Sequence, residues 1–160
     1  MVPRSMRFST SSEEETERFG ERLGGLLGEG AIVGLVGPLG AGKTTLVRGI
    51  ARGLGVEEGV VASPTFLTAA QYQGKLEVTH IDLYRHADRL PDPDWLAELL
   101  DGEGVALVEW FERLGDSARD DALRIEIAFG RLAGERRFTL RALGPRADAV
   151  LRVLEGERAA

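Results

Sequence analysis

The sequence has 160 residues, of which 43% are hydrophobic and 29% are charged, and its formal net charge at pH 7 is −6. A chain of this length fits one domain with a substantial core, so we expect a single domain over residues 1–160. The absence of cysteine excludes disulfides, thiolate metal sites and cysteine nucleophiles. The acidic balance argues against nucleic-acid backbone binding as the main source of affinity, although it leaves room for a local basic patch.

The opening residues carry no targeting signal that the sequence reveals. Residues 1–7 lack the apolar centre of a secretory signal, and no apolar run approaches the roughly 18 residues of a membrane span. We therefore expect a cytoplasmic protein without a membrane partner. Residues 1–7 are candidates for disorder or for a remnant of an expression vector, with Met6 as the natural start.

The first predicted elements are a helix and a strand. Ser12–Glu15 fits a capping box, with Ser12 as the N-cap and Glu15 at the third helical position. The helix should run to about Leu27, and apolar residues at helical spacing should be buried. These residues are Phe19, Leu23, Leu26 and Leu27. A strand over 31–36 follows.

A glycine-rich loop follows this strand. Gly37, Gly42, Lys43 and Thr44 fill the fixed positions of G-x-x-x-x-G-K-[ST], which is the phosphate-binding loop (P-loop). Such a loop needs glycine because its backbone takes positive φ angles and lies close to a polyphosphate. Its N–H groups bind phosphates, the lysine reaches the β- and γ-phosphates, and the Thr44 hydroxyl holds Mg²⁺. The predicted nucleotide-binding residues here are Gly37, Pro38, Leu39, Gly40, Ala41, Gly42, Lys43, Thr44 and Thr45. A helix over 44–54 should end at Gly55.

The segment Ser63–Thr65 has two interpretations. Because the residue before a proline favours an extended conformation, the segment enters a strand and can be merely a turn. Alternatively, it is a switch loop. A threonine about twenty residues after a P-loop can add a hydroxyl to Mg²⁺ or sense the γ-phosphate, which makes Thr65 a candidate catalytic residue.

Two carboxylates are candidates for the second part of the metal site. Strands over 68–72 and 76–81 should form an antiparallel pair, and Asp82 follows the second strand. His80 shares a face with Asp82, and we interpret it as a structural histidine. A buried strand over 105–108 precedes Glu109, which is the cleaner Walker B pattern because parallel strands end at the phosphate site. The sequence does not rank Asp82 and Glu109.

The remaining elements surround these strands. Pro91 and Pro93 should interrupt regular secondary structure after residue 86, and Asp94 should cap a short helix over 95–100. Segments 122–129 and 136–143 alternate strongly and predict a hairpin with one buried face. Pro145 should open a last helix. Its buried residues should be Val150, Leu151 and Leu154.

Four motifs in this order resemble one family. They are Gly37–Thr45, Ser63–Phe66, His80–Arg85 and Val108–Trp110. Together the motifs are similar to those of the bacterial ATPase subunit of tRNA threonylcarbamoyladenosine biosynthesis (TsaE/YjeE type). The likeness runs from about Glu13 to Phe129. It implies an α/β, three-layer P-loop NTPase fold with a mixed, partly antiparallel sheet, so that residues 1–160 form one P-loop ATPase domain.

The resemblance also implies an activity, cofactors and partners. It implies ATP and Mg²⁺ as cofactors, ATP hydrolysis that is weak without partners, and docking on a threonylcarbamoyl transferase subunit and its paralogous dimerisation partner. That heterodimer modifies the adenosine next to the anticodon, and tRNA contact by the ATPase would be indirect. By position, Thr44 and Glu109 hold Mg²⁺, Asp82 is the Walker B-like acid, and Trp110 lies close to the site. Residues 63–66 form the switch loop.

Some features depart from the family or leave rivals open. After Arg85, the family usually has leucine and a pair of glutamates, whereas this chain has His86 and the proline-rich segment 90–93, so any partner contacts there differ.

A small-molecule kinase is the main alternative function, although the segment after Arg85 is short for a lid. A GTPase is disfavoured because the chain has no asparagine for a guanine-reading motif. A binding module that uses ATP only for assembly is a third class.

The hypothesis for catalysis is in-line attack of water on the γ-phosphate. Lys43 and the Mg²⁺ held by Thr44 and Glu109 would neutralise the developing charge. Asp82 would orient the water or the metal's ligands, and Thr65 would report the γ-phosphate to the partner.

Overall fold

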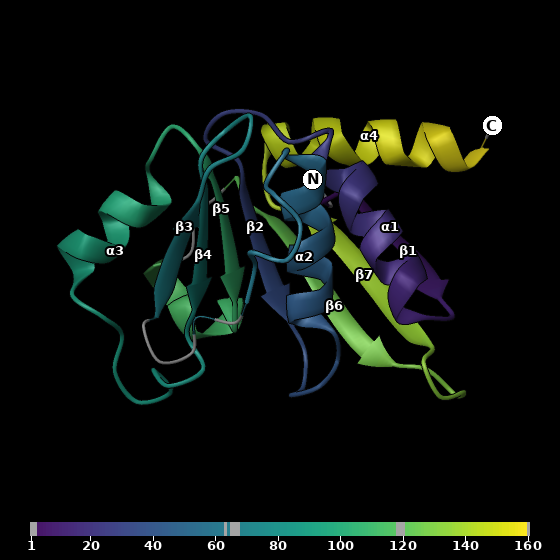
Figure 1. The fold of residues 1–160 in the computed structure, drawn as a ribbon, viewed down its shortest axis with the longest axis horizontal. Coiled ribbons are helices and arrows are strands. Elements are labelled where there is room, and N and C mark those ends of the chain that lie inside the picture. The colour runs from purple at the N-terminus through teal and green to yellow at the C-terminus, as the bar shows by residue number, and fades with distance from the viewer. Residues whose placement is uncertain (1–2, 63, 65–67, 118–120, 160) are drawn as a thin grey trace.

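A computed structural model describes residues 3–62, 64, 68–117 and 121–159. Its strands are β1 (Ser5–Thr10), β2 (Ile32–Val36), β3 (Ala69–Tyr72), β4 (Val78–Asp82), β5 (Val105–Glu109), β6 (Leu123–Phe129) and β7 (Arg136–Ala142). Its helices are α1 (Glu13–Gly24), α2 (Lys43–Gly53), α3 (Pro93–Leu100) and α4 (Pro145–Ala159), with the 3-10 helix η1 (Phe111–Ser117). Figure 1 shows these elements in one α/β unit.

The seven strands form one mixed sheet, as predicted, in the order β1-β7-β6-β2-β5-β4-β3. The central strands are parallel: β2 lies between β5 and β6, and β5 also pairs with β4. The flanking pairs β3–β4, β6–β7 and β1–β7 are antiparallel. Because parallel strands end at the same edge of a sheet, the residues that follow β2, β4 and β5 meet there.

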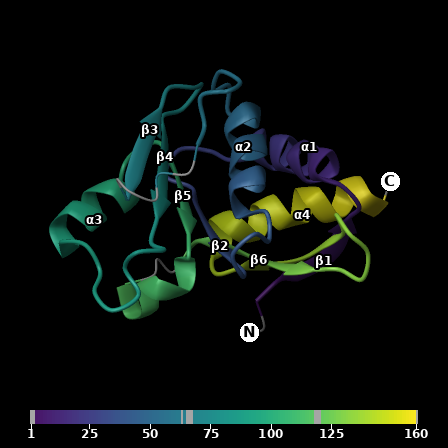
Figure 2. The same cartoon turned by 60° about the horizontal axis from the view of Figure 1, so that its bottom comes forward.

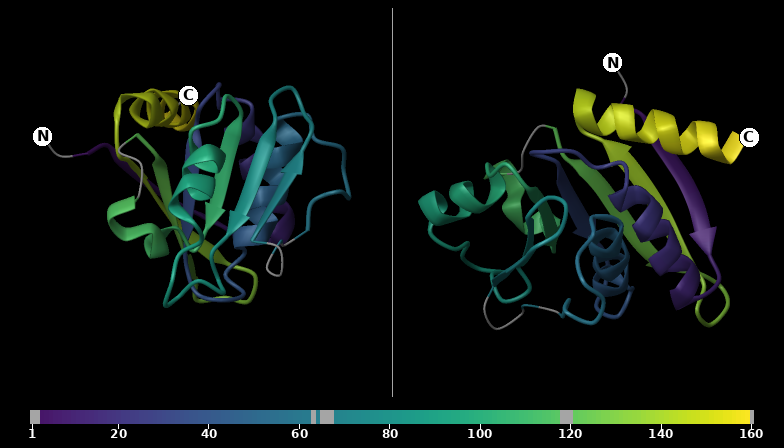
Figure 3. Two further views of the ribbon diagram at one scale, coloured as in Figure 1. Left: turned by 90° about the vertical axis from the view of Figure 1, so that its left-hand side faces the viewer. Right: turned by 45° about the horizontal axis from the view of Figure 1, so that its top comes forward.

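The sheet separates two hydrophobic clusters and so forms the middle of three layers, as predicted. Helices α1, α2 and α4 pack on one face, with Leu23, Ile50 and Leu151 fully buried. On the other face, α3 and η1 pack against β2, β4 and β5 through Leu96 and Phe111. Figure 3 shows the layers from two further directions. Among the described residues, no helix is long and apolar enough to cross a membrane.

Two predicted helix boundaries need correction. Ser12 caps α1 as predicted, since its hydroxyl accepts a hydrogen bond of 3.2 Å from the Glu15 N–H, but the helix ends at Gly24 rather than near Leu27. Consecutive glycines at 24 and 25 favour this earlier end because glycine has low helix propensity. Helix α3 is capped by Asp92, not Asp94, because proline suits the first helical position.

Strand β1 is the main element absent from the sequence-based prediction. It pairs with β7 from Ser5↔Arg141 to Thr10↔Arg136, and Met6 is buried. The origin of residues 1–7 stays untested, but residues 5–7, which the sequence indicates as candidates for disorder, therefore belong to the sheet. Their order comes from hydrogen bonds to a strand about 130 residues away, which local sequence patterns do not encode.

Helices α1 and α2 touch along glycines. A Cβ at Gly20 would lie 2.8 Å from the Leu46 carbonyl oxygen, and one at Gly49 would overlap the Glu17 carbonyl. The close approach holds α2 against the layer behind it. It therefore fixes the start of α2, where the P-loop ends.

We expect Gly49→Ala to lower the free energy of unfolding by about 1–3 kcal/mol, because the new methyl group must displace backbone. Urea denaturation measures this change. Gly156→Ala in α4 is the matched control: a Cβ there meets nothing within 4 Å, so alanine should stabilise slightly through helix propensity. Equal stability of the Gly49→Ala and parent proteins would contradict tight packing between α1 and α2.

Candidate functional site

The P-loop joins β2 to α2 and encloses the lysine side chain. Gly40 and Gly42 have φ angles of +81° and +104°, which glycine adopts without strain. The Lys43 ammonium donates hydrogen bonds to the carbonyl oxygens of Gly37 (2.6 Å) and Pro38 (2.9 Å). Lys43 is only 5% exposed, so its ammonium depends on protein groups for hydrogen bonds, and the loop carbonyls supply them. Any phosphate that binds Lys43 must compete with these two carbonyls.

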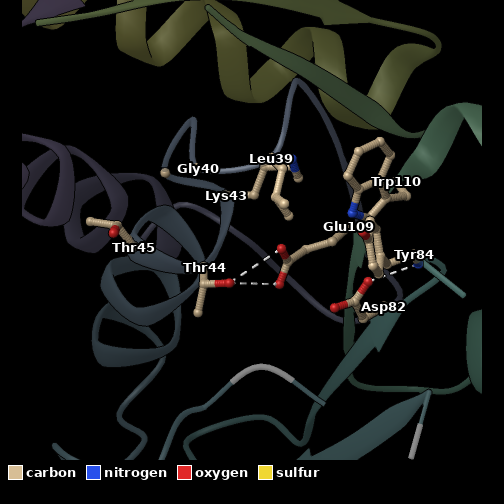
Figure 4. A pocket seen from close by; sticks show the side chains of 10 residues that line it. Leu39, Gly40, Lys43, Thr44, Thr45, Asp82, Tyr84, Glu109 and Trp110 are labelled. Carbon is tan, nitrogen blue, oxygen red and sulfur yellow. Dashed lines mark hydrogen bonds between the residues drawn. The ribbon is translucent and has the colours of Figure 1, made fainter. Parts of the chain in front are cut away.

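Glu109 is the centre of the polar contacts at the end of β5. Its carboxylate accepts hydrogen bonds from the Thr44 hydroxyl at 3.3 and 3.2 Å (Figure 4). It also lies 2.6 Å from Nε2 of His80, which donates because a carboxylate accepts. Glu109 is 3% exposed and His80 is fully buried. The Glu109 carboxylate at the end of β5 thus contacts both Thr44 at the start of α2 and His80 in β4.

Asp82 lies beside Glu109 at the end of the neighbouring strand. The β4–β5 register pairs Asp82 with Glu109, and both side chains face the pocket (Figure 4). The Asp82 carboxylate accepts a 2.9 Å hydrogen bond from the Tyr84 N–H. The parallel sheet therefore brings both predicted carboxylates to the predicted loop.

These groups line a pocket of about 310 Å³. Its lining residues are Leu39, Gly40, Gly42, Lys43, Thr44, Thr45, Asp82, Tyr84, Glu109 and Trp110. The other predicted loop residues lie close by: the carbonyls of Gly37 and Pro38 bind Lys43, and Ala41 is buried. The pocket is concave and lined by a few polar groups, which is typical of a small-molecule site.

Trp110 turns sharply out of β5 over the lysine. Its φ of +60° is unusual for a bulky residue, and such backbone strain is concentrated at functional sites. The Lys43 ammonium lies 4.3 Å from the centroid of its ring, and the Arg113 guanidinium carbon lies 4.5 Å from it. Arg113 also donates hydrogen bonds to the carbonyls of Leu83 and Tyr84. It thereby links the β4 end to the β5 end.

Burial sets the electrostatics of Lys43. Desolvation lowers the pKa of its ammonium below the ordinary lysine value, while the nearby carboxylate of Glu109 acts in the opposite direction. The carboxylates of Glu109, Glu112 and Asp82 favour the charged ammonium but do not offset its desolvation, so further negative charge would stabilise it. An anionic ligand would supply that charge, which favours phosphate binding beside Lys43.

The donor groups fit a magnesium nucleotide. Thr44, Asp82 and Glu109 offer only oxygen atoms, which Mg²⁺ prefers, and Mg²⁺ usually binds through one or two carboxylates plus substrate phosphates. In the part of the chain that the structure describes, no cluster of three or more His, Cys, Asp or Glu residues could hold a metal without such help. The site thus suits a metal that arrives with phosphate.

The structure leaves the predicted switch loop untested and changes the interpretation of His80. Thr65, Ser63 and Phe66 of the predicted switch loop lie outside the described residues. His80, which the sequence indicates as a structural histidine, contacts the carboxylate of the site directly. Arg113 is a site residue that the sequence does not reveal, because a lone arginine after Trp110 carries no motif. Only the fold brings it to the carbonyls of Leu83 and Tyr84 at the end of β4.

We expect His80→Ala to lower the free energy of unfolding by about 1–3 kcal/mol, because the buried Glu109 carboxylate loses a hydrogen bond. Thermal or urea unfolding measures the loss, and the nucleotide affinity in Mg²⁺ should fall as Glu109 loses its fixed position. The matched control is His86→Ala, since His86 is the other histidine and is only half-buried. Equal effects of the two substitutions would contradict a positioning role for His80.

The strand–loop–helix unit, with carboxylates at the ends of β4 and β5, defines the class of the molecule: it is an α/β protein with the P-loop fold. A model of one family within this class matches residues 10–138, and its description is "Threonylcarbamoyl adenosine biosynthesis protein TsaE". The chain belongs to this family.

Curated relatives agree with this assignment. The tRNA threonylcarbamoyladenosine biosynthesis protein TsaE of Treponema pallidum is 41% identical over 123 residues, covering 76% of this chain and 90% of the relative. The protein of the same name from Bacillus subtilis is 36% identical over 146 residues, with 89% of each chain covered. The crystal structure of Bacillus subtilis YdiB superposes with a TM-score of 0.81 at 29% identity, covering 99% of both chains.

Proposed function

We propose that this protein is the Mg²⁺-dependent ATPase subunit of tRNA threonylcarbamoyladenosine modification. It acts in the cytoplasm on the threonylcarbamoyl transferase subunit and its paralogous dimerisation partner. The observation that carries this proposal is the contact between the Thr44 hydroxyl and the Glu109 carboxylate beside the P-loop. The family supplies the biological context, because curated relatives are named for this tRNA modification.

The proposed cofactors are ATP and Mg²⁺. Backbone N–H groups of residues 37–45 would hold the phosphates, and Thr44, Glu109 and Asp82 would hold Mg²⁺. When bound, the metal would supply positive charge to the β- and γ-phosphate oxygens. Trp110 would lie beside the phosphates because its ring already covers the Lys43 ammonium. The missing asparagine supports adenine over guanine, since a common guanine-reading motif needs that residue.

In the proposed reaction, a water oxygen attacks the γ-phosphorus and the bond from that phosphorus to the β–γ bridging oxygen breaks. ADP leaves with the electron pair of that bond, and the water's protons remain on the phosphate product or pass to solvent. Lys43 would stabilise the charge that develops on the leaving oxygens. Asp82 would orient the water, and Thr65 would report the γ-phosphate to the partner.

The geometry of Lys43 supports weak hydrolysis by the isolated protein. Its ammonium is bound to the carbonyls of Gly37 and Pro38, and Trp110 lies over it. Productive phosphate binding therefore requires these contacts to rearrange. A partner that stabilises the rearranged loop would raise the rate without adding a catalytic group.

The test is ATP hydrolysis by this protein alone, and again with the transferase pair of the same organism, with and without tRNA. We expect low turnover alone and a clear increase with the pair. A rate that is indifferent to the pair would contradict the proposal. Phosphate transfer to a small acceptor would then be screened, because that result favours a small-molecule kinase.

A further inference from the structure

One part of the sheet's second face, formed by β1, β7 and β6, is covered by no helix that the structure describes. Helices α1, α2 and α4 lie on one side of β1, β7 and β6, whereas α3 and η1 pack against β2, β4 and β5. Figure 2 shows the outer side of β1 and β6 open to solvent. The alternation of burial along the three strands identifies the side chains on this outer face. They are Ser5, Arg7, Ser9, Arg124, Glu126, Ala128, Arg137, Thr139 and Arg141.

This outer face is strongly basic in an acidic protein. It carries four arginines and one glutamate, whereas the whole chain has a net charge of −6. The carboxylate of Glu126 is only 3.5 Å from Arg124, and Arg137 is 3.8 Å from Glu135 at the edge of the face. Counted formally, the four arginines exceed these two carboxylates, so the face carries a net positive charge. A shallow hollow of about 450 Å³ runs between Arg7, Glu126 and Arg137.

The strand register places like charges together. Arg124 and Arg141 are direct partners across β6 and β7, and like charges directly opposite each other destabilise a sheet. Arg7 faces Thr139, one row along from this pair. Within the fold, Glu126 offsets part of this repulsion through its contact with Arg124. An anion that spans the rows would offset the repulsion, because guanidinium groups bind phosphate through two parallel hydrogen bonds.

We propose that the outer face of β1, β7 and β6 binds the phosphate backbone of RNA, so that tRNA contacts this protein directly. A repeating polyanion matches several arginines on a flat sheet better than a single small anion does. A second copy of the chain is disfavoured because two basic faces would repel each other. A membrane is disfavoured because the face offers no large apolar side chain to insert.

The proposal goes beyond the proposed ATPase function, in which tRNA contact runs through the transferase pair. It specifies contact without base recognition, since none of the described side chains on the face is aromatic and able to stack on a base. Affinity should therefore depend steeply on salt and little on RNA sequence. The net charge of −6 for the whole chain is compatible with this local excess of positive charge.

The test uses a fluorescently labelled, unmodified tRNA transcript and fluorescence anisotropy at several salt concentrations between about 50 and 200 mM. In the variant Arg7→Gln/Arg137→Gln/Arg141→Gln, we expect the Kd for tRNA at low salt to rise about tenfold or more. The slope of log affinity against log salt should fall by about 2, close to 0.7 for each lost phosphate contact. An unrelated RNA of the same length should behave like the tRNA.

The matched control is Arg18→Gln/Arg22→Gln/Arg152→Gln, which removes the same charge from exposed helix positions. We expect it to bind tRNA within about twofold of the parent at equal salt. Equal losses in both variants, or no tRNA binding by the parent protein at 50 mM salt, would overturn the proposal. So would loss of affinity for the transferase pair with unchanged tRNA binding, because the face would then bind an acidic protein.

Two readouts separate this proposal from the ATPase function. Thermal unfolding shows that the arginine variant folds, and binding of a fluorescent ATP analogue shows that its pocket is intact. If tRNA binds through the arginines while the transferase pair fails to stimulate hydrolysis, the RNA-binding face stands and the ATPase proposal fails. If the pair stimulates hydrolysis while the variant binds tRNA as the parent does, the ATPase proposal stands and the RNA-binding face fails.

Discussion

Lys43→Ala is expected to reduce ATP turnover by at least about a hundredfold, even when the transferase pair is present. The ammonium is the buried positive charge beside the P-loop, and a preorganised group that stabilises developing charge contributes about this much to catalysis. Affinity for ATP should also fall, because burial already disfavours the charged lysine and phosphate is the compensating partner. Steady-state hydrolysis and titration with a fluorescent ATP analogue measure the two effects.

The chain contains its own control for this substitution. Lys75 is the other lysine, and it is exposed in the turn between β3 and β4. Lys75→Ala should leave turnover and affinity within about twofold of the parent, since an exposed charge far from the pocket is screened by solvent. Thermal unfolding of both variants excludes misfolding as the cause. Normal ATP hydrolysis by Lys43→Ala would contradict the proposed role of Lys43 and of the P-loop in the reaction.

The sequence predicted the positions of the loop and the two carboxylates because each belongs to a local pattern. The fixed spacing of Gly37, Gly42 and Lys43 marks the loop, and an acid after an apolar run marks a strand end. The structure adds the register, in which Asp82 and Glu109 are direct neighbours. Register depends on pairing between separate strands. The sequence therefore placed both acids at one metal site without showing that they are direct neighbours.

The contacts around Glu109 and Trp110 were beyond prediction for a related reason. His80 and Asp82 alternate along β4, which indicates a shared face, but the partner of His80 lies on another strand. Arg113 meets Trp110 locally, within the first turn of η1, but its hydrogen bonds to the carbonyls of Leu83 and Tyr84 come from a separate part of the chain. Such partners are set by tertiary packing. The same limit hid β1, whose alternation is short and whose hydrogen bonds come from β7.

Glu109→Gln is expected to reduce Mg²⁺-supported hydrolysis by about a hundredfold or more while leaving nucleotide binding without Mg²⁺ nearly unchanged. Glutamine keeps the size of the side chain and an oxygen that accepts from Thr44 or His80, so the fold should persist. What it loses is the negative charge that a hard divalent cation requires. Hydrolysis rates over a range of Mg²⁺ concentrations, together with ATP affinity in excess chelator, measure both parts.

Asp82→Asn makes the same change of charge on the neighbouring strand, so the pair of variants ranks the two acids that the sequence could not rank. Glu109 bonds the Thr44 hydroxyl, whereas the Asp82 carboxylate accepts from the Tyr84 N–H. We therefore expect Glu109→Gln to raise the Mg²⁺ concentration needed for half-maximal activity, and Asp82→Asn to lower the rate at saturating Mg²⁺ with a smaller shift in that concentration. If the shift appears in Asp82→Asn and not in Glu109→Gln, Asp82 is the main metal ligand. The contact between Thr44 and Glu109 would then serve only to fasten α2 to β5.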